Sequence, residues 1–138
     1  CRPSEQVVAA LWGKIFYNAA LNPLGAVHGL SYGELAADPA HRTRMDRAIA
    51  EGFEVASAEG VQMPWPTVQK YLELFYGSLV PSTADHRSSM LQDIERGKPT
   101  EIEAITGQIC RRGAAAGIAT PENDSLRAAI KEIEEARL

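Results

Sequence analysis

The spacing of apolar residues limits the possible folds of this chain more than any other feature, because it follows the helical period almost throughout. From Ser4 to about Leu21 the apolar side chains recur every three or four residues: Val7, Val8, Leu11, Trp12, Ile15, Phe16 and Ala19. Such spacing is typical of a helix, whereas a half-buried strand would alternate apolar and polar residues between turn signals. No stretch shows that alternation, so we predict an all-α fold.

Proline and glycine indicate where the predicted helices end. The first helix is expected to stop at Asn22-Pro23, because a residue that precedes proline is pushed out of the helical region of the backbone. Residues 78–85 are expected to form a loop. Further helices are expected over residues 31–37, 39–59, 67–77, 86–96, 100–116 and from Pro121 onward.

Capping residues indicate how the last two helices begin and end. Thr100 and Glu103 have the spacing of a capping box, in which each side chain bonds the backbone N–H of the other residue. Gly117 stands where a left-handed cap would end that helix. Thr120 is expected as the N-cap of the last helix, with Pro121 in its first position. The whole chain, residues 1–138, is therefore expected to form one helical domain.

Composition excludes several classes of protein. The chain has 138 residues, of which 45% are hydrophobic and 23% charged, as is typical of a soluble globular domain. The formal net charge is -4 and the basic residues are scattered, which argues against a nucleic-acid partner. No apolar run approaches the length that spans a bilayer and no signal peptide is visible, so no membrane partner is expected.

The spacing of cysteine and histidine residues argues against a metal site. Cys1 and Cys110 are far apart, and we interpret them as unpaired thiols in a reducing compartment, which predicts a cytoplasmic protein. His28, His41 and His86 lack ligand-like spacing to one another and to the cysteines, so no zinc site is expected.

The first helix carries the clearest signal for chemistry. Within its apolar sequence, Lys14, Asn18 and Asn22 are spaced i, i+4, i+8 and therefore form one polar stripe. A buried lysine or amide without a partner is costly, so this stripe should face something polar. Gly13 would let a ligand or another backbone approach closely. The alternative is that Lys14 extends to solvent and both asparagines form a solvated edge.

Two further positions are weaker signals when each is taken alone. Ser88 and Ser89 stand near the start of a predicted short helix, where free N–H groups favour an anion such as a carboxylate. The simpler interpretation is that one serine caps the helix. Glu101 has no role in the predicted capping box, but an acidic residue in a first helical turn is favourable by itself.

Taken together and in this order, these signals resemble the C-terminal domain of ketopantoate reductases (2-dehydropantoate 2-reductases). The resemblance covers essentially the whole chain. The matching segments are Leu-Trp-Gly-Lys-Ile-Phe-Tyr-Asn-Ala-Ala-Leu-Asn-Pro-Leu (residues 11–24), Ser-Ser-Met-Leu-Gln-Asp-Ile (88–94), Thr-Glu-Ile-Glu (100–103) and Gly-Ile-Ala-Thr-Pro-Glu-Asn (117–123). The resemblance implies a helical fold like the C-terminal domain of 6-phosphogluconate dehydrogenase.

The resemblance also implies a second domain. The family has an N-terminal dinucleotide-binding domain with a glycine-rich phosphate loop, and the active site lies in the cleft between the two domains. No Gly-x-Gly-x-x-Gly turn follows a strand in this chain, which does not begin with Met. We therefore expect the substrate-binding domain without its partner domain, with NADPH bound mainly by the absent part and with homodimerisation open.

The resemblance assigns roles residue by residue. Lys14 matches the catalytic lysine, a general acid that protonates the alkoxide as hydride reaches the ketone carbon. Glu101 matches the glutamate that binds the substrate hydroxyl and helps to position that lysine. Asn18 and Asn22 match asparagines that orient the substrate or the lysine, and Ser89 matches a serine that holds the substrate carboxylate. No cofactor or metal ligand is assigned within this chain.

Two positions depart from the family pattern, and one of them bears on substrate specificity. Glu103 replaces the usual aspartate, and Thr106 stands before Gly107 where asparagine is usual. The loss of an amide at Thr106 leaves another small 2-oxo acid open as the substrate. A different class of function also remains open, namely a helical dimerisation module without chemistry, in which the predicted site residues would scatter and apolar surface would gather in one patch.

Overall fold

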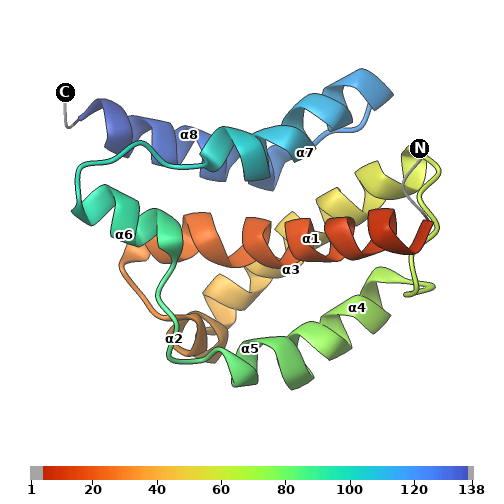
Figure 1. Cartoon of the computed structure of the whole chain (residues 1–138), viewed down its shortest axis with the longest axis horizontal. Helices are drawn as coiled ribbons and strands as arrows, with labels where there is room; N and C mark the ends of the chain where they lie inside the picture. The colour runs from red at the N-terminus through yellow and green to blue at the C-terminus, as the bar shows by residue number, and fades with distance from the viewer. Residues whose placement is uncertain (1–4, 137–138) are drawn as a thin grey trace.

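The computed structural model describes residues 5–136, which form helices and the loops that connect them (Figure 1). Within this range there is no β-strand; Ser31 and Arg87 form an isolated bridge pair. The all-α prediction is confirmed. The helices are α1 (Glu5–His28), α2 (Tyr32–Ala37), α3 (Pro39–Ala58), α4 (Val68–Leu74), the π-helical turn η1 (Phe75–Leu79), α5 (Val80–Ser82), α6 (Ser89–Glu95), α7 (Ile102–Ala116) and α8 (Pro121–Glu135).

Helix α1 runs through the middle of the molecule and contacts α2, α3, α6, α7 and α8 (Figure 1). The α7–α8 pair lies along one side of α1, and the α4–η1–α5 segment lies along the other side. The apolar spacing on α1 places Phe16, which is fully buried, at the centre of the main core. Its ring contacts the rings of Phe53 and Tyr71, with centroids 5.8 and 5.3 Å away. Because α1 contacts so many elements, their packing determines which residues lie around its polar stripe.

A second, smaller apolar cluster joins the start of α6 and the start of α7 to the C-terminal half of α1. Its buried members are Ala26, Met90, Leu91, Ile94, Ile102 and Ile130. Burying a side chain of this size stabilises the fold by about 1.5–3 kcal/mol. The cluster therefore fixes the two helix starts on which Ser89 and Glu101 were predicted to act.

The predicted end of the first helix at Asn22-Pro23 is wrong, because α1 continues through Pro23 to His28. Proline in a helix removes one N–H bond and costs about 3 kcal/mol in an isolated helix. Tertiary contacts offset that cost here. Leu21 and Leu24 are fully buried, and Ala26 packs in the second cluster, so ending the helix would remove these side chains from the core.

The predicted loop over residues 78–85 is also wrong in its first half, since η1 and α5 extend the helical path to Ser82. A π-helical turn brings residues i and i+5 close together. The Val80 N–H bonds the Phe75 carbonyl, and both side chains are buried, with exposed fractions of 4% and 0%. The extra residue of the π-turn therefore lets two side chains five positions apart face the same core.

The helix starts near the C-terminus differ from the predicted caps. The capping box predicted at Thr100 and Glu103 does not form among the described residues: Glu101 is the N-cap of α7 and makes no side-chain cap bond, and Glu103 instead bonds cations. Thr120 occupies the predicted N-cap position of α8, but its side chain does not cap the helix. The prediction for Gly117 is confirmed, because it ends α7 in the left-handed region at φ 73°.

Candidate functional site

The polar stripe on α1 becomes progressively more buried toward its C-terminal end. Lys14 is exposed, Asn18 is half-buried, and Asn22 is 4% exposed. Eight residues of α-helix span about 12 Å, so Lys14 and Asn22 lie at the two ends of a stripe long enough to contact a small molecule and its surroundings. The stripe therefore combines a cation that is unpaired among the described residues with an amide that the fold holds in place.

Asn22 is tied to two other elements. Its side-chain oxygen Oδ1 accepts a hydrogen bond of 2.6 Å from the Tyr32 hydroxyl at the start of α2. Its backbone carbonyl accepts a hydrogen bond of 2.8 Å from Oγ of Ser88, at the start of α6. Both contacts are buried. A single hydrogen bond therefore links the stripe directly to the start of α6.

The two adjacent serines at the start of α6 have different roles. Ser88 is fully buried and caps the helix, because its Oγ accepts from the Leu91 N–H at 3.3 Å. Ser89 is the first residue of α6 and is exposed. Ser88 therefore caps the helix. The Ser89 hydroxyl makes no side-chain bond among the described residues, so it can bind a ligand at the same helix start.

Two glutamates near the start of α7 differ in their contacts. Glu101 is exposed at the N-cap position. Glu103 accepts from Arg111 at 2.8 Å, from Arg127 at 2.8 Å and from Lys131 at 2.9 Å. The hydrogen bonds from Arg127 and Lys131 lower the pKa of Glu103 to about 2. The Glu103 carboxylate is thus bonded within the fold, whereas the Glu101 carboxylate makes no side-chain bond among the described residues.

Four of the five predicted site residues have side chains without a partner among the described residues. Within the part of the chain that the structure describes, no side-chain hydrogen bond or ion pair involves Lys14, Asn18, Ser89 or Glu101. We call these four residues the unpaired set. Asn22 and Ser89 are brought together through Ser88, and Glu101 directly precedes Ile102, which packs in the same cluster as Met90 of α6. Lys14 stands apart from them at the other end of the stripe.

An apolar pocket of about 340 Å³ lies beside Lys14. It is lined by Ala10, Gly13, Lys14, Tyr17, Trp65, Tyr71, Leu74 and Leu79. The two tyrosine hydroxyls are bonded elsewhere, Tyr17 to Thr83 Oγ1 at 2.8 Å and Tyr71 to the Gly13 carbonyl at 2.9 Å. The pocket therefore presents ring carbons and aliphatic groups next to the Lys14 ammonium.

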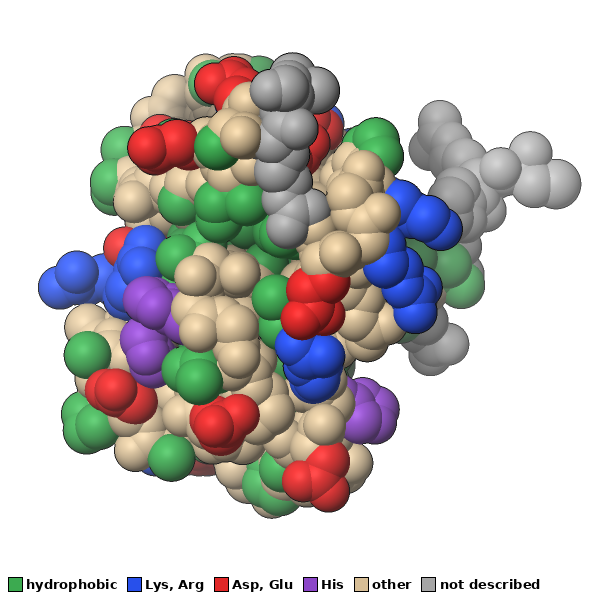
Figure 2. Space-filling view, turned by 90° about the vertical axis from the view of Figure 1, so that its left-hand side faces the viewer, with side chains coloured by type: hydrophobic (Ala, Val, Ile, Leu, Met, Phe, Trp, Pro, Cys, Tyr) green, Lys and Arg blue, Asp and Glu red, His purple; other side chains and the backbone are tan. Residues whose placement is uncertain are grey.

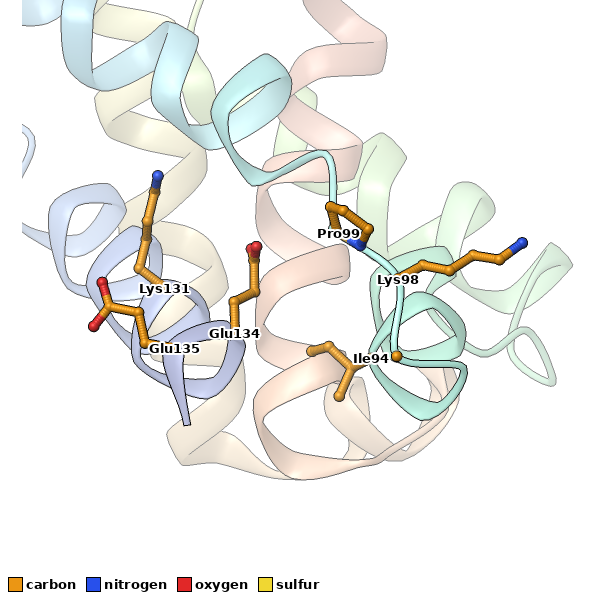
Figure 3. A pocket seen from close by; sticks show the side chains of 7 residues that line it. Ile94, Lys98, Pro99, Lys131, Glu134 and Glu135 are labelled. Atoms are coloured by element: carbon orange, nitrogen blue, oxygen red, sulfur yellow. The ribbon is translucent and has the colours of Figure 1, made fainter. Parts of the chain in front are cut away.

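A second cavity, of about 310 Å³, contains none of the predicted residues. It lies between α8 and the segment that leaves α6, and Figure 3 shows Lys131, Glu134 and Glu135 rising from α8 on one side, with Ile94 and Pro99 on the other. The end of the molecule formed by α6 and the C-terminal part of α8 carries interspersed acidic and basic side chains (Figure 2). This mixture of charges gives no preference for an anionic or a cationic ligand.

Sequence reasoning missed Tyr32, and it singled out Ser88 as an anion site or helix cap but not as a residue that holds Asn22. A signal for Tyr32 was present, because Ser31 and Glu34 form a capping box that fixes the start of α2. The hydrogen bond from Ser88 to the Asn22 carbonyl spans 66 positions and has no local signature. Thr106, one of the two departures from the family pattern, is fully buried, and its hydroxyl lacks a partner among the described residues. It therefore does not line an open site.

Among residues 5–136, no group of three or more His, Cys, Asp or Glu side chains could hold a metal ion. In the same range, no helix has both the length and the apolar character needed to cross a membrane. Cys110 is buried and its thiol is free, with its pKa raised to about 12 chiefly by burial. Cys1 and the predicted helix start at Ser4 lie outside the described residues.

Comparison with known proteins gives a consistent result. Residues 6–134 match the family described as "Ketopantoate reductase PanE/ApbA C terminal". A 2-dehydropantoate 2-reductase of Aquifex aeolicus is 41% identical over 130 residues, which are 94% of this chain and 42% of that protein. This chain therefore spans less than half the length of that relative.

Solved structures agree with the sequence match. A PanE/ApbA family ketopantoate reductase from Ralstonia eutropha JMP134 superposes with a TM-score of 0.83 at 36% identity, covering 94% of this chain and 42% of that one. A D-mandelate dehydrogenase, solved with NADH and anilino(oxo)acetate, gives a TM-score of 0.86 at 26% identity, covering 97% of this chain and 43% of that one. The family match, the shared residues and the helical fold together show that this chain belongs to the ketopantoate reductase C-terminal domain family.

Proposed function

We propose that this chain is the substrate-binding domain of an NADPH-dependent 2-dehydropantoate 2-reductase, which reduces ketopantoate to pantoate on the route to coenzyme A. The observation that carries the proposal is the unpaired set: an ammonium, an amide, a hydroxyl and a carboxylate that the described fold leaves without internal partners. Three of these side chains are exposed and the fourth is half-buried, so a ligand can bond all four without breaking a contact of the described fold. The partner is an N-terminal dinucleotide-binding domain outside this chain, and we place the protein in the cytoplasm because Cys110 is a free thiol.

In this proposal Lys14 is the general acid. NADPH supplies a hydride to the ketone carbon of the substrate, and negative charge develops on the ketone oxygen. The Lys14 ammonium stabilises that charge and transfers a proton to the oxygen, which gives the alcohol. The exposed position of Lys14 on α1 suits a site that a second domain would cover.

The remaining residues hold the substrate. Ser89 lies exposed at the start of α6 and donates its hydroxyl to the substrate carboxylate. Glu101 accepts from the substrate hydroxyl. Asn18 and Asn22 orient the substrate from the α1 stripe. The anchoring of Asn22 by Tyr32 and Ser88 supports this division, because a binding group is most effective when its orientation is fixed before the ligand arrives.

Another small 2-oxo acid is an alternative substrate for the same chemistry. The apolar pocket beside Lys14 has room for a larger hydrocarbon group than the two methyl groups of ketopantoate. The similarity to a D-mandelate dehydrogenase solved with an aromatic oxoacetate favours this alternative.

A non-catalytic dimerisation module is the second candidate function. It is favoured by exposed apolar side chains on α1 and α4, where Val7, Leu11 and Leu74 are 51%, 55% and 37% exposed. Dimerisation through such side chains is compatible with catalysis, so a homodimer is part of the proposal. The two functions differ in what substitution of Lys14 would do.

The test is NADPH oxidation by the full-length protein with ketopantoate as substrate. Lys14→Ala is expected to lower kcat/KM roughly 10²–10⁴-fold, the usual contribution of a general acid, with little change in Tm. Lys70→Ala is the matched control, because Lys70 is an exposed helical lysine whose only described ion pair, to Glu73, is long at 3.5 Å. Activity largely retained by Lys14→Ala would contradict the proposed role. The isolated chain is expected to lack micromolar affinity for NADPH in calorimetry.

A further inference from the structure

The side-chain amide of Asn22 has a defined orientation. Its oxygen Oδ1 accepts from the Tyr32 hydroxyl at 2.6 Å in a buried contact, so the nitrogen Nδ2 points to the other side of the planar amide. Among the described residues, Nδ2 donates no side-chain hydrogen bond, and it is not one of the buried nitrogens and oxygens that lack a partner. Nδ2 therefore has no partner among the described residues, in a residue that is 4% exposed.

Tyr32 is held firmly enough to impose this orientation. It is 6% exposed, its ring packs edge-on against Tyr17 with centroids 5.9 Å apart, and its backbone N–H bonds the His86 carbonyl at 3.0 Å. The capping box of Ser31 fixes the start of α2 on which Tyr32 stands. Burial, with a smaller contribution from Tyr17, raises the pKa of the Tyr32 hydroxyl to about 12. The hydroxyl therefore stays protonated at neutral pH and remains the donor in its bond to Asn22.

The backbone beneath Asn22 is fixed from a third element. Ser88, which is fully buried, donates to the Asn22 carbonyl at 2.8 Å and caps α6 with the same hydroxyl. Gly25 allows this approach, since a Cβ added there would lie 3.3 Å from the Cβ of Ser88. Asn22 and the neighbouring Ser89 are thus held in one arrangement whose outward groups are an amide N–H and a hydroxyl.

We propose that Tyr32 is a positioning residue that turns the Asn22 amide so that its N–H group faces the substrate, and that the site therefore selects an oxygen acceptor at this point. The proposal rests on the proposed function and adds to it a residue outside the predicted site. The chemical class selected is an oxo or carboxylate oxygen, not a hydroxyl that must donate. Tyr32 acts through Asn22 and does not contact the substrate.

A purely structural role for the pair makes a different prediction. If the bond only stabilised the contact between α1 and α2, removing either partner would change stability and leave the remaining partner's effect on catalysis unaltered. If Tyr32 acts by orienting Asn22, its hydroxyl should have no effect on catalysis once the Asn22 amide is gone. A double-mutant cycle separates these two cases.

The experiment measures kcat and KM for the full-length protein with ketopantoate and NADPH. Tyr32→Phe removes only the hydroxyl and is expected to raise KM about fivefold to tenfold, the value of one hydrogen bond. Asn22→Asp keeps an acceptor for Tyr32 but presents a carboxylate where an N–H stood, and it is expected to raise KM roughly 100-fold. In the Asn22→Ala background, Tyr32→Phe is expected to change KM by less than about twofold.

Tyr76→Phe is the matched control, because the Tyr76 hydroxyl also makes a 2.6 Å bond, to Asp46 on α3, and lies outside the proposed site. It is expected to leave KM unchanged. Equal effects of Tyr32→Phe in the wild-type and Asn22→Ala backgrounds would overturn the inference, as would an Asn22→Asp variant with the KM of the wild type. Loss of the proposed function would look different, because the unaltered protein would then fail to reduce any 2-oxo acid.

Discussion

Glu101 and Glu103 stand two residues apart at the start of α7, and the fold treats them in opposite ways. Glu101 is exposed and belongs to the unpaired set, whereas Glu103 is bonded by Arg111, Arg127 and Lys131. Side chains near the start of α7 therefore differ in function: Glu103 stabilises the packing of α7 against α8, and Glu101 is accessible to a ligand. A side chain that already has three partners has little to offer a ligand.

The same contrast holds for whole regions. Where α3 meets α8, Glu51 bonds the backbone N–H groups of Glu122 and Asn123 at 2.8 and 2.9 Å and also bonds the Asn123 side chain. Arg44 is paired with Glu122 at 2.6 Å. We call Glu51 and Glu103, with the groups that they bond, the paired set. Substitutions in the unpaired set should affect activity, and substitutions in the paired set should affect stability.

The largest expected effect is on activity. Glu101→Gln replaces the charged carboxylate that accepts a hydrogen bond from the substrate hydroxyl with a neutral amide. The value of kcat/KM for ketopantoate in the full-length protein is expected to fall roughly 100-fold. The Tm is expected to stay within about 1 °C, because Glu101 makes no side-chain bond within the described chain. Activity is measured by NADPH oxidation and stability by thermal unfolding. A fall in Tm with unchanged activity would invert the comparison.

The next effect is on stability. Glu51→Ala leaves two backbone N–H groups at the start of α8 without an acceptor and deprives the fully buried Asn123 of one partner. The expected loss is about 2–3 kcal/mol in the free energy of unfolding, measured by urea titration. Glu54→Ala, an exposed position on the same helix, is the control and should be nearly neutral. Equal stability of the two variants would show that Glu51 does not cap α8.

The smallest effect concerns pH. The pKa of Glu103 is lowered to about 2 from an ordinary value of 4.5, chiefly by Arg127 and then by Lys131. A lowered pKa stabilises the folded state above pH 4.5, and this contribution is lost as the pH falls from 4.5 toward 2. Because the cluster is partly exposed, we expect Glu103→Gln to lower the free energy of unfolding at pH 7 by only about 1 kcal/mol.

The pH dependence sharpens this prediction. Urea titrations at pH 7, 4.5 and 3 should show a difference between wild type and Glu103→Gln that shrinks as the pH falls. Glu132→Gln, an exposed substitution on α8, should show no such convergence. A difference that grows toward low pH would mean that folding raises the pKa of Glu103, and that the three cations do not stabilise its charged form.

Much of the helical fold could be predicted because its signals are local. The order of the helices and the left-handed Gly117 were predicted correctly, since apolar spacing and glycine act within a few residues. Thr120 stands at the predicted N-cap position, but its side chain makes no cap bond there. The errors came from long-range packing. Burial of Leu21 and Leu24 carries α1 through Pro23, and burial of Phe75 and Val80 imposes a π-turn where a loop was expected.

The sequence indicates which residues to propose for the candidate site, but not the contacts that support them. Residue type and order indicated Lys14, Ser89 and Glu101, and their roles remain predictions. Glu103 was expected to cap α7, yet three cations from α7 and α8 draw it away, and no local pattern shows such an approach. The bond from Tyr32 to Asn22 was likewise hidden, because it depends on how α2 packs against α1.

The π-helical turn restricts where this chain can change its length. Deleting the exposed Gly77 would place Phe75 and Val80 four positions apart, a spacing that an ordinary α-helix already holds on one face. Both anchors would then stay in the core while η1 closed as α-helix. An insertion within η1 would instead place them six positions apart, and in an α-helix residues at that spacing lie on different faces. Insertions are better absorbed in the non-helical stretch before Thr67, where no such pair of anchors sets the length.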